Sequence, residues 1–255
     1  MSLLLEARNI GKHFGGVQAL KDVSLTINSG EIYGLIGPNG AGKTTFFNVL
    51  TGLYSRDGGE VLFNGKPLKL GNPAAVAEAG VARTFQNIRL FANMTALENV
   101  MVGRHVRTRS GILGAVLRTR RNRHEEAAIQ RRAEELLHYV GIAHRANDLA
   151  RNLSYGDQRR LEIARALATE PKLLALDEPA AGMNATETAE LRKLIEGLRN
   201  DGLTVLLIEH DVKLVMGLCD RLAVLDYGEK IAEDIPEVVQ KNPKVIEAYL
   251  GASHD

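Results

Sequence analysis

Residues 37–44 read GPNGAGKT, a glycine-rich run that ends in a lysine and a threonine. An apolar run at 31–36, which predicts a buried strand, precedes it, and residues 43–51 have a composition compatible with a helix. The spacing matches G-x-x-x-x-G-K-[ST]. Glycines in this pattern let successive backbone N–H groups face one point, and the helix N-terminus adds its positive end. The strand, turn and helix together predict a phosphate-binding loop in an α/β protein.

The loop supplies the candidate ligands of a nucleotide polyphosphate. Lys43 carries a mobile positive charge for the outer phosphates, and Thr44 offers a hydroxyl to Mg²⁺. The metal is expected because the polyphosphate would otherwise repel an attacking nucleophile. A glycine-rich turn with a chance lysine is the alternative, and the flanking strand and helix argue against it. The expected nucleotide contacts are Gly37, Pro38, Asn39, Gly40, Ala41, Gly42, Lys43, Thr44 and Thr45.

Strands and helices alternate again later in the chain. Strands are expected at 172–176 and 204–208, and helices at 186–199 and 212–218. Such alternation predicts a mostly parallel sheet. Extended segments at 3–10 and 23–27, with Gly15 and Gly16 between them, predict an antiparallel sheet at the N-terminus.

Between these halves the strand signal disappears. Thr95 and Glu98 have the spacing of a capping box, and residues 125–139 are long, charged and periodic. We therefore expect one domain over 1–255, in which a helical subdomain at 88–168 is inserted into an α/β core formed by 1–87 and 169–255. After Asp220, short strands with a turn at Gly228 and a helix at 243–250 complete the expected elements.

Composition excludes several classes of protein. The 255 residues are 45% hydrophobic and 25% charged, as in an ordinary folded domain, and 32 Lys and Arg against 31 Asp and Glu give a net charge of +1. The global charge therefore makes no case for nucleic-acid binding. The one cysteine, Cys219, fits a reducing compartment, and we expect a cytoplasmic protein. No apolar run reaches the ~20 residues of a membrane span, so any work at a membrane is expected from outside the bilayer.

Three polar residues that follow apolar strands are candidates for hydrolysis. Asp177 and Glu178 end the strand at 172–176, and His210 follows the strand at 204–208. Ligands of open α/β sheets bind at such carboxyl ends. We expect Asp177 to orient the Mg²⁺ shell and Glu178 to act as general base toward water. His210 is expected to contact the γ-phosphate and the attacking water, although a lone histidine there is more often structural.

Two further residues are weaker candidates. Gln86 follows a short extended run at 81–85, and its amide could bind Mg²⁺ or a water molecule. Phe14, beside Gly15 and Gly16, could stack on adenine. Without the other motifs, an unremarkable loop glutamine and simple core packing would be the preferred explanations.

Residues 153–160, LSYGDQRR, resemble the signature of ATP-binding cassette (ABC) proteins. Ser154 is a helix-cap residue, and Gly156 permits close approach of the backbone to a ligand. The resemblance implies a RecA-like P-loop NTPase core with an N-terminal antiparallel β subdomain and an inserted α-helical subdomain. It also implies that two cassettes close head to tail around two ATP molecules, with Ser154 and Gly156 contacting the nucleotide of the partner.

Closer matching points to a subfamily. The stretches VARTFQNIRLF (81–91), SYGDQRRLEIAR (154–165), DEPAAGMN (177–184), IEHDVKLVM (208–216) and NPKVIEAYLG (242–251) look like the larger ATP-binding subunit of branched-chain amino-acid importers. Tyr155, Asp157 and Asn184 depart from the usual ABC pattern, which has Gly, Gln and Asp there. The exact cargo is left open by these motifs.

This resemblance implies an ATP hydrolase on the cytoplasmic face of the inner membrane. Its implied partners are permease subunits, a second and distinct cassette, and indirectly a periplasmic or extracellular substrate-binding protein. The alternatives are a lipid or lipopolysaccharide exporter cassette, a soluble mechanical ABC ATPase, and a binding module without hydrolysis; intact Glu178 and His210 argue against the last. Residues 104–124 hold seven arginines and no acid, a run that suits anionic lipid head groups, an acidic face of a partner or, last, nucleic acid, with a plain solvated loop as the alternative. Given the resemblance, we favour proximity to the bilayer surface over a catalytic role.

Overall fold

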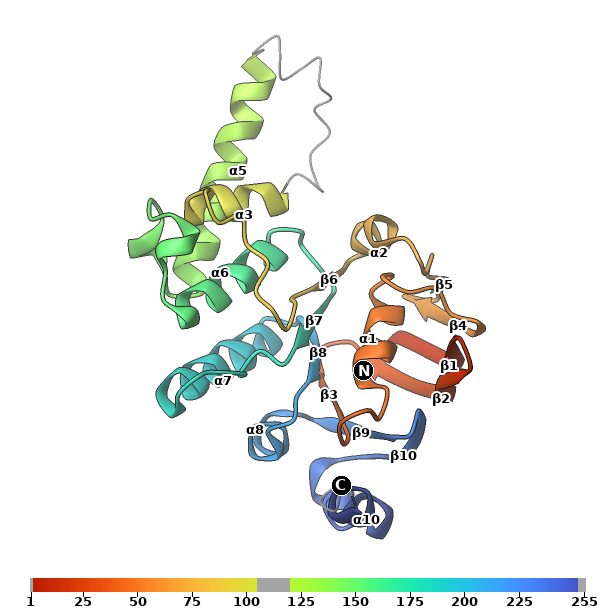
Figure 1. Cartoon of the computed structure of the whole chain (residues 1–255). Helices are drawn as coiled ribbons and strands as arrows, with labels where there is room; N and C mark the ends of the chain where they lie inside the picture. The colour runs from red at the N-terminus through yellow and green to blue at the C-terminus, as the bar shows by residue number, and fades with distance from the viewer. Residues whose placement is uncertain (1, 105–119, 252–255) are drawn as a thin grey trace.

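The computed structural model describes residues 2–104 and 120–251 (Figure 1). A six-stranded sheet of order β10-β9-β3-β8-β7-β6 lies at its centre. Neighbours from β9 to β6 are parallel, and β10 joins β9 as an antiparallel edge. The predicted parallel sheet is thus confirmed. Its strands are β3 (Ile32–Ile36), β6 (Val81–Arg83), β7 (Leu173–Asp177), β8 (Thr204–Ile208), β9 (Arg221–Asp226) and β10 (Glu229–Asp234).

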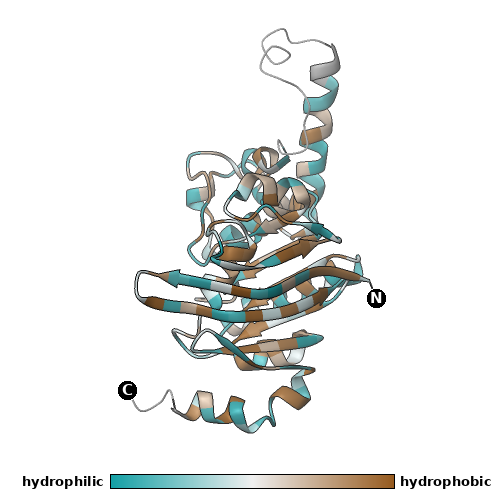
Figure 2. Cartoon of the chain, turned by 90° about the vertical axis from the view of Figure 1, so that its right-hand side faces the viewer, coloured by the Kyte–Doolittle hydropathy of each residue, from teal (hydrophilic) through white to brown (hydrophobic). Residues whose placement is uncertain are grey.

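A second, antiparallel sheet of order β2-β1-β4-β5 covers one side of the molecule. Hydrophobic and hydrophilic residues mix along its long strands (Figure 2), as expected for a sheet with one covered face. The N-terminal prediction is confirmed, but β1 and β2 are longer than the predicted segments because pairing extends through polar residues. The strands are β1 (Leu3–Phe14), β2 (Val17–Asn28), β4 (Gly58–Phe63) and β5 (Lys66–Pro67).

Helix α1 (Lys43–Leu50) joins the two sheets. Its Phe46 and Phe47 are fully buried in a core that includes residues of β1, β2, β3 and β8. Burying an aromatic side chain stabilises the fold by about 2–3 kcal/mol, so this packing anchors the start of the helix against the sheet. The phosphate loop that precedes α1 is thereby placed at the carboxyl end of β3.

A second core covers the other face of the central sheet. Leu191 and Ile195 of α7 (Ala185–Asn200) and Leu161 of α6 (Tyr155–Leu167) pack there with β7 and β8. The remaining helices of the α/β part are α2 (Pro73–Ala79), α8 (Val212–Leu218), α9 (Pro236–Val239) and α10 (Pro243–Gly251). In Figure 1, α10 lies at the opposite end of the molecule from α5.

The part of the chain predicted to be helical contains no named strand among its described residues. It comprises α3 (Ala96–Arg104), α5 (Arg120–Tyr139), the short helices η2 (Ala143–Arg145) and η3 (Ala150–Asn152), and α6. Glu98 accepts from the Thr95 backbone N–H at 2.8 Å, and the Glu98 N–H donates to the Thr95 hydroxyl at 3.2 Å, which confirms the capping box. The division into subdomains at 88 and 168 stays a prediction.

Residues 105–119 of the basic segment at 104–124 lie outside the described residues, and its last residues, 120–124, begin α5. Across residues 2–104 and 120–251, none of the helices combines the length and the apolar character needed to cross a bilayer.

Candidate nucleotide-binding site

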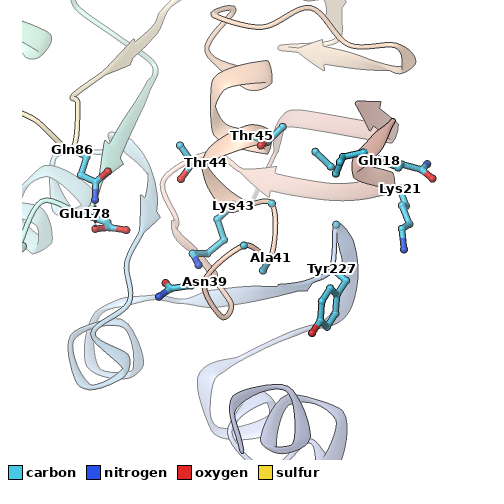
Figure 3. A pocket seen from close by; sticks show the side chains of 15 residues that line it. Gln18, Lys21, Asn39, Ala41, Lys43, Thr44, Thr45, Gln86, Glu178 and Tyr227 are labelled. Atoms are coloured by element: carbon cyan, nitrogen blue, oxygen red, sulfur yellow. Dashed lines mark hydrogen bonds between the residues drawn. The ribbon is translucent and has the colours of Figure 1, made fainter. Parts of the chain in front are cut away.

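A cavity of about 470 Å³ opens at the carboxyl end of β3 (Figure 3). Residues 39–45 of the phosphate loop and α1 form its floor, and Gln86 and Glu178 lie on one side. Residues 17–19 and Lys21 of β2 and the turn at Tyr227–Gly228 complete the wall. The cavity therefore gathers most of the predicted phosphate ligands with residues from four other parts of the chain.

The backbone of the loop admits only glycine at two positions. Gly37 has φ 149°, and a Cβ there would lie 2.1 Å from the carbonyl oxygen of Leu225. Gly42 has φ 97°, and a Cβ there would lie 2.8 Å from the carbonyl oxygen of Ala19. Both values of φ fall where L side chains are strained. The glycines predicted from the motif are thus required by the packing of the loop against β2 and β9.

Lys43 places its ammonium group over the loop. Its Nζ donates to the carbonyl oxygens of Gly37 at 2.6 Å and Pro38 at 2.8 Å. Burial lowers the pKa of Lys43, and the negative charge of Glu178 opposes that shift. The amino group of Lys43 lies at the N-terminus of α1, where the helix dipole also favours an anionic ligand.

Glu178 and Gln86 point toward one another (Figure 3). Nε2 of Gln86 donates to Oε2 of Glu178 at 2.8 Å, and Nδ1 of His210 lies 3.6 Å from the same oxygen. Glu178 has φ 45°, an uncommon left-handed conformation for a residue with a side chain, and its N–H donates to the Ile208 carbonyl at 2.9 Å. The structure thus brings together three of the predicted catalytic residues beside Lys43.

Asp177, the residue before Glu178, is buried at the end of β7. Nη2 of Arg83 lies 3.4 Å from its carboxylate, and Nη1 of Arg83 donates to Asn48 of α1 and to Thr51, which caps that helix. Burial raises the pKa of Asp177, and the charge of Arg83 opposes the shift. Asp177 is thus tied to α1 through Arg83 and does not line the cavity itself.

Phe14 lies outside the cavity wall. Its ring meets Tyr54 edge-on, with centroids 5.3 Å apart, and Nζ of Lys12 lies 5.5 Å from its centroid. The exposed aromatic ring that lines the cavity is Tyr227, in the turn between β9 and β10. Tyr227 was not predicted from the sequence, although an aromatic residue directly before Gly228 in a turn is a signal that could have pointed to it.

Glu209 is a second residue that sequence analysis missed. It is fully buried, and its carboxylate accepts from the backbone N–H groups of Ala180 at 2.9 Å and His210 at 3.2 Å. It therefore ties the loop after Glu178 to the end of β8. An acid at the end of an apolar strand was the available signal, but nothing local indicated its partners.

The signature residues lie at the N-terminus of α6 and do not line the cavity. Ser154 caps the helix by accepting from the Asp157 N–H at 3.2 Å. Gly182, in the loop after Glu178, faces the ring of Tyr155, with 3.5 Å between an ideal Cβ on Gly182 and Cε1 of that ring. Within one chain, Ser154 and Gly156 are thus separate from the phosphate loop.

A glycine-rich loop over a parallel sheet, an acidic strand end and an inserted helical segment define a P-loop nucleotide-binding protein. The family model described as "ABC transporter" matches residues 20–181, and the one described as "Branched-chain amino acid ATP-binding cassette transporter" matches residues 229–255. The chain belongs to the ABC transporter family and is an ATP-binding cassette ATPase.

Several curated proteins resemble it along nearly its whole length. The high-affinity branched-chain amino acid transport ATP-binding protein LivG of Escherichia coli (strain K12) is 47% identical over 249 residues, covering 97% of this chain and 98% of that protein. The corresponding protein BraF of Pseudomonas aeruginosa is 45% identical, with 97% and 98% covered. The lipopolysaccharide export system ATP-binding protein LptB of Escherichia coli (strain K12) is 36% identical, with 97% of each covered.

Solved structures agree with the fold. The crystal structure of the ADP conformation of an ATP-binding cassette of an ABC transporter matches with a TM-score of 0.85 and 34% identity, covering 98% of this chain and 100% of that one. A dimeric post-hydrolysis cassette bound to ADP and Pi matches with a TM-score of 0.77 and 27% identity, covering 91% and 99%. The predicted fold and enzyme class are confirmed.

Proposed function

We propose that this chain hydrolyses ATP to drive uptake of branched-chain or related amino acids through a membrane permease. The observation that carries the proposal is the likeness to LivG, which extends over almost the whole of both chains. LptB is less similar, so an exporter cassette is the second candidate. The proposed partners are permease subunits, a second and distinct cassette, and indirectly a substrate-binding protein, with this chain peripheral on the cytoplasmic face of the membrane.

The residues around the cavity divide the work of hydrolysis. Residues 37–45 hold the phosphates through backbone N–H groups and Lys43. Glu178 takes a proton from the attacking water, and His210, 3.6 Å away, contacts that water and the γ-phosphate. Oε2 of Glu178 accepts from the amide of Gln86, so the other carboxylate oxygen, Oε1, can accept the proton of the water.

The oxygen-bearing side chains of the site fit Mg²⁺. This hard cation prefers oxygen ligands and is usually held by one or two carboxylates together with substrate phosphates. Thr44 and Gln86 line the cavity and offer a hydroxyl and an amide oxygen, and Asp177 offers a carboxylate at the adjacent strand end. Thr44 and Gln86 would hold the ion and Asp177 would orient its shell from outside the cavity wall, and the ion would supply charge neutralisation of the phosphates. Phe14 remains a candidate contact for adenine, and Ser154 and Gly156 for the nucleotide of the partner.

The base role of Glu178 is tested by Glu178→Gln. We expect ATP binding to persist and turnover to fall about 100-fold or more, because the amide cannot accept the proton of water. The measurement is phosphate release and ATP affinity for the purified protein. The matched control is Glu135→Gln, which removes an exposed carboxylate paired with Arg132 on α5. Turnover at the normal rate in Glu178→Gln would remove Glu178 from the base role.

The transport function is tested by what co-purifies. The Glu178→Gln variant, tagged in its native host and solubilised with ATP and Mg²⁺, is expected to retain two polytopic membrane proteins and a second small cassette. Purified complex can then be screened for stimulation of ATPase activity by branched-chain amino acids. Recovery of ribosomal or DNA-repair proteins would overturn the proposal, and recovery of lipopolysaccharide-export subunits would favour the second candidate.

A further inference from the structure

Helix α6 contains an ion pair that water does not reach. The side chains of Arg159 and Glu162 are 0% and 1% exposed, and Nη1 lies 2.9 Å from Oε2. Removing both charges from water is costly, and such pairs are retained only where further hydrogen bonds satisfy them. Nε of Arg159 has no hydrogen-bond partner among the described residues. Packing stability is therefore a poor explanation for this pair.

The pair binds the loop that carries Gln86. Arg159 donates to the carbonyl oxygens of Phe85 at 2.6 Å and Gln86 at 2.8 Å. Glu162 accepts from the backbone N–H groups of Phe85 at 3.2 Å and Arg89 at 3.3 Å. Four hydrogen bonds from one turn of α6 thus determine the backbone of residues 85–89.

The same arginine reaches the signature. Its Nη2 donates to the hydroxyl of Tyr155 at 3.1 Å, next to the cap residue Ser154. At its other end, the backbone of Gln86 is held by Arg159 while the side chain of Gln86 donates to Glu178. A continuous series of hydrogen bonds therefore runs from the signature end of α6 to Glu178.

We propose that Arg159, supported by Glu162, is a positioning residue that holds the backbone of Gln86 to α6 and so sets the contact of the Gln86 side chain with Glu178. Neither residue lines the cavity, so neither touches nucleotide. The two donors of the guanidinium match two successive carbonyls, a geometry that a lysine ammonium cannot reproduce. The inference rests on the proposed function, because its readout is ATP hydrolysis.

A double-mutant cycle tests the inference in the full-length chain within the complex that it forms. Arg159→Met is expected to lower kcat about tenfold while KM for ATP stays within about twofold. In a Gln86→Ala background the same substitution is expected to change kcat by less than about twofold, because Arg159 acts through Gln86. Effects that multiply in the double variant would overturn the inference, since they would show that Arg159 acts independently of Gln86.

Arg160→Met is the matched control. Arg160 is the next residue of α6, but its side chain is 22% exposed and pairs with Glu190 on α7. Its replacement is expected to leave kcat and KM unchanged, and a loss equal to that of Arg159→Met would also overturn the inference. If Arg159→Met does not fold, Glu162→Gln carries the same cycle, because it keeps the side-chain volume and removes the charge. Absence of hydrolysis in the wild-type complex would overturn the proposed function itself, whereas wild-type hydrolysis with multiplying effects overturns only the role of Arg159.

Discussion

Ionisation of the buried Glu209 carboxyl group lowers the free energy of unfolding of the protein. Burial raises its pKa above the ordinary glutamate value, and hydrogen bonds from Ala180 and the charge of His210 offset only part of that shift. Between the two pKa values the native state holds a proton that the unfolded state has released. Stability therefore falls as the pH rises from about 4.5 through the raised native pKa, and is constant above it.

Glu209→Gln is expected to remove this contribution. The difference in unfolding free energy between variant and wild type should shift in favour of the variant as the pH rises through that window. Urea unfolding at several pH values measures it, and the buried acids Asp177 and Glu162 cancel because both proteins contain them. Glu229→Gln, which removes a carboxylate with a 57% exposed side chain, is the control. A difference that does not vary with pH would contradict the prediction.

Individual site residues differ in how well the sequence predicts them. Lys43, Glu178 and His210 belong to local patterns in which a strand ends beside a loop, and the cavity gathers or adjoins all three. Tyr227 reaches the cavity because the backbone of its neighbour Gly228 donates to Ala41 and accepts from Lys21. Those contacts join residues about 190 and 210 positions apart, and no local pattern specifies them. A contact between residues distant in the sequence, Phe14 and Tyr54, also places Phe14 outside the cavity wall.

The start of α7 explains why asparagine can replace the usual aspartate of the ABC pattern at position 184. The side chain of Asn184 accepts from the N–H groups of Thr186 and Glu187 at 3.0 Å each, and Glu187 returns a contact to the Asn184 N–H at 2.9 Å. An aspartate, which is commoner there, would form the same capping box. Asn184 thus performs the local structural task of the usual residue.

Asn184→Ala is therefore expected to destabilise the protein by about 1 kcal/mol, whereas Asn184→Asp should change stability by less than about 0.5 kcal/mol. Chemical denaturation of the three proteins measures both values. Equal losses in the two variants would show that the amide itself, rather than a capping oxygen, is required at this position.

Elements were predictable where burial or capping is local. The apolar runs of β3, β7 and β8 and the capping of α3 are continuous in sequence, and each was found within a residue or two. Helix α2 was missed, although Asn72 caps it and Pro73 begins it, because its seven residues bury only Val76. A helix with so little buried surface shows weak periodicity, and its place is determined by contacts with β6.

Each chain presents its phosphate loop and its signature at separate places on the molecule. Ser154 is exposed at the N-terminus of α6 and lies outside the cavity of its own chain. We propose that it lies against the nucleotide of a partner cassette, where the positive end of α6 would face phosphate.

The Ser154→Asp variant tests whether the signature and the phosphate loop of one chain contact different nucleotides. Aspartate is as good a cap as serine, so α6 should be retained, but its charge would repel the phosphates of a partner's nucleotide. We expect ATP affinity of the isolated chain to stay within about twofold and hydrolysis by the assembled pair to fall about tenfold. Asparagine has the size and the capping ability of aspartate but no charge, so the Ser154→Asn variant should lose much less activity than Ser154→Asp. If Ser154→Asp weakened ATP binding by the isolated chain, the signature would act on its own cavity, and the head-to-tail arrangement would be wrong.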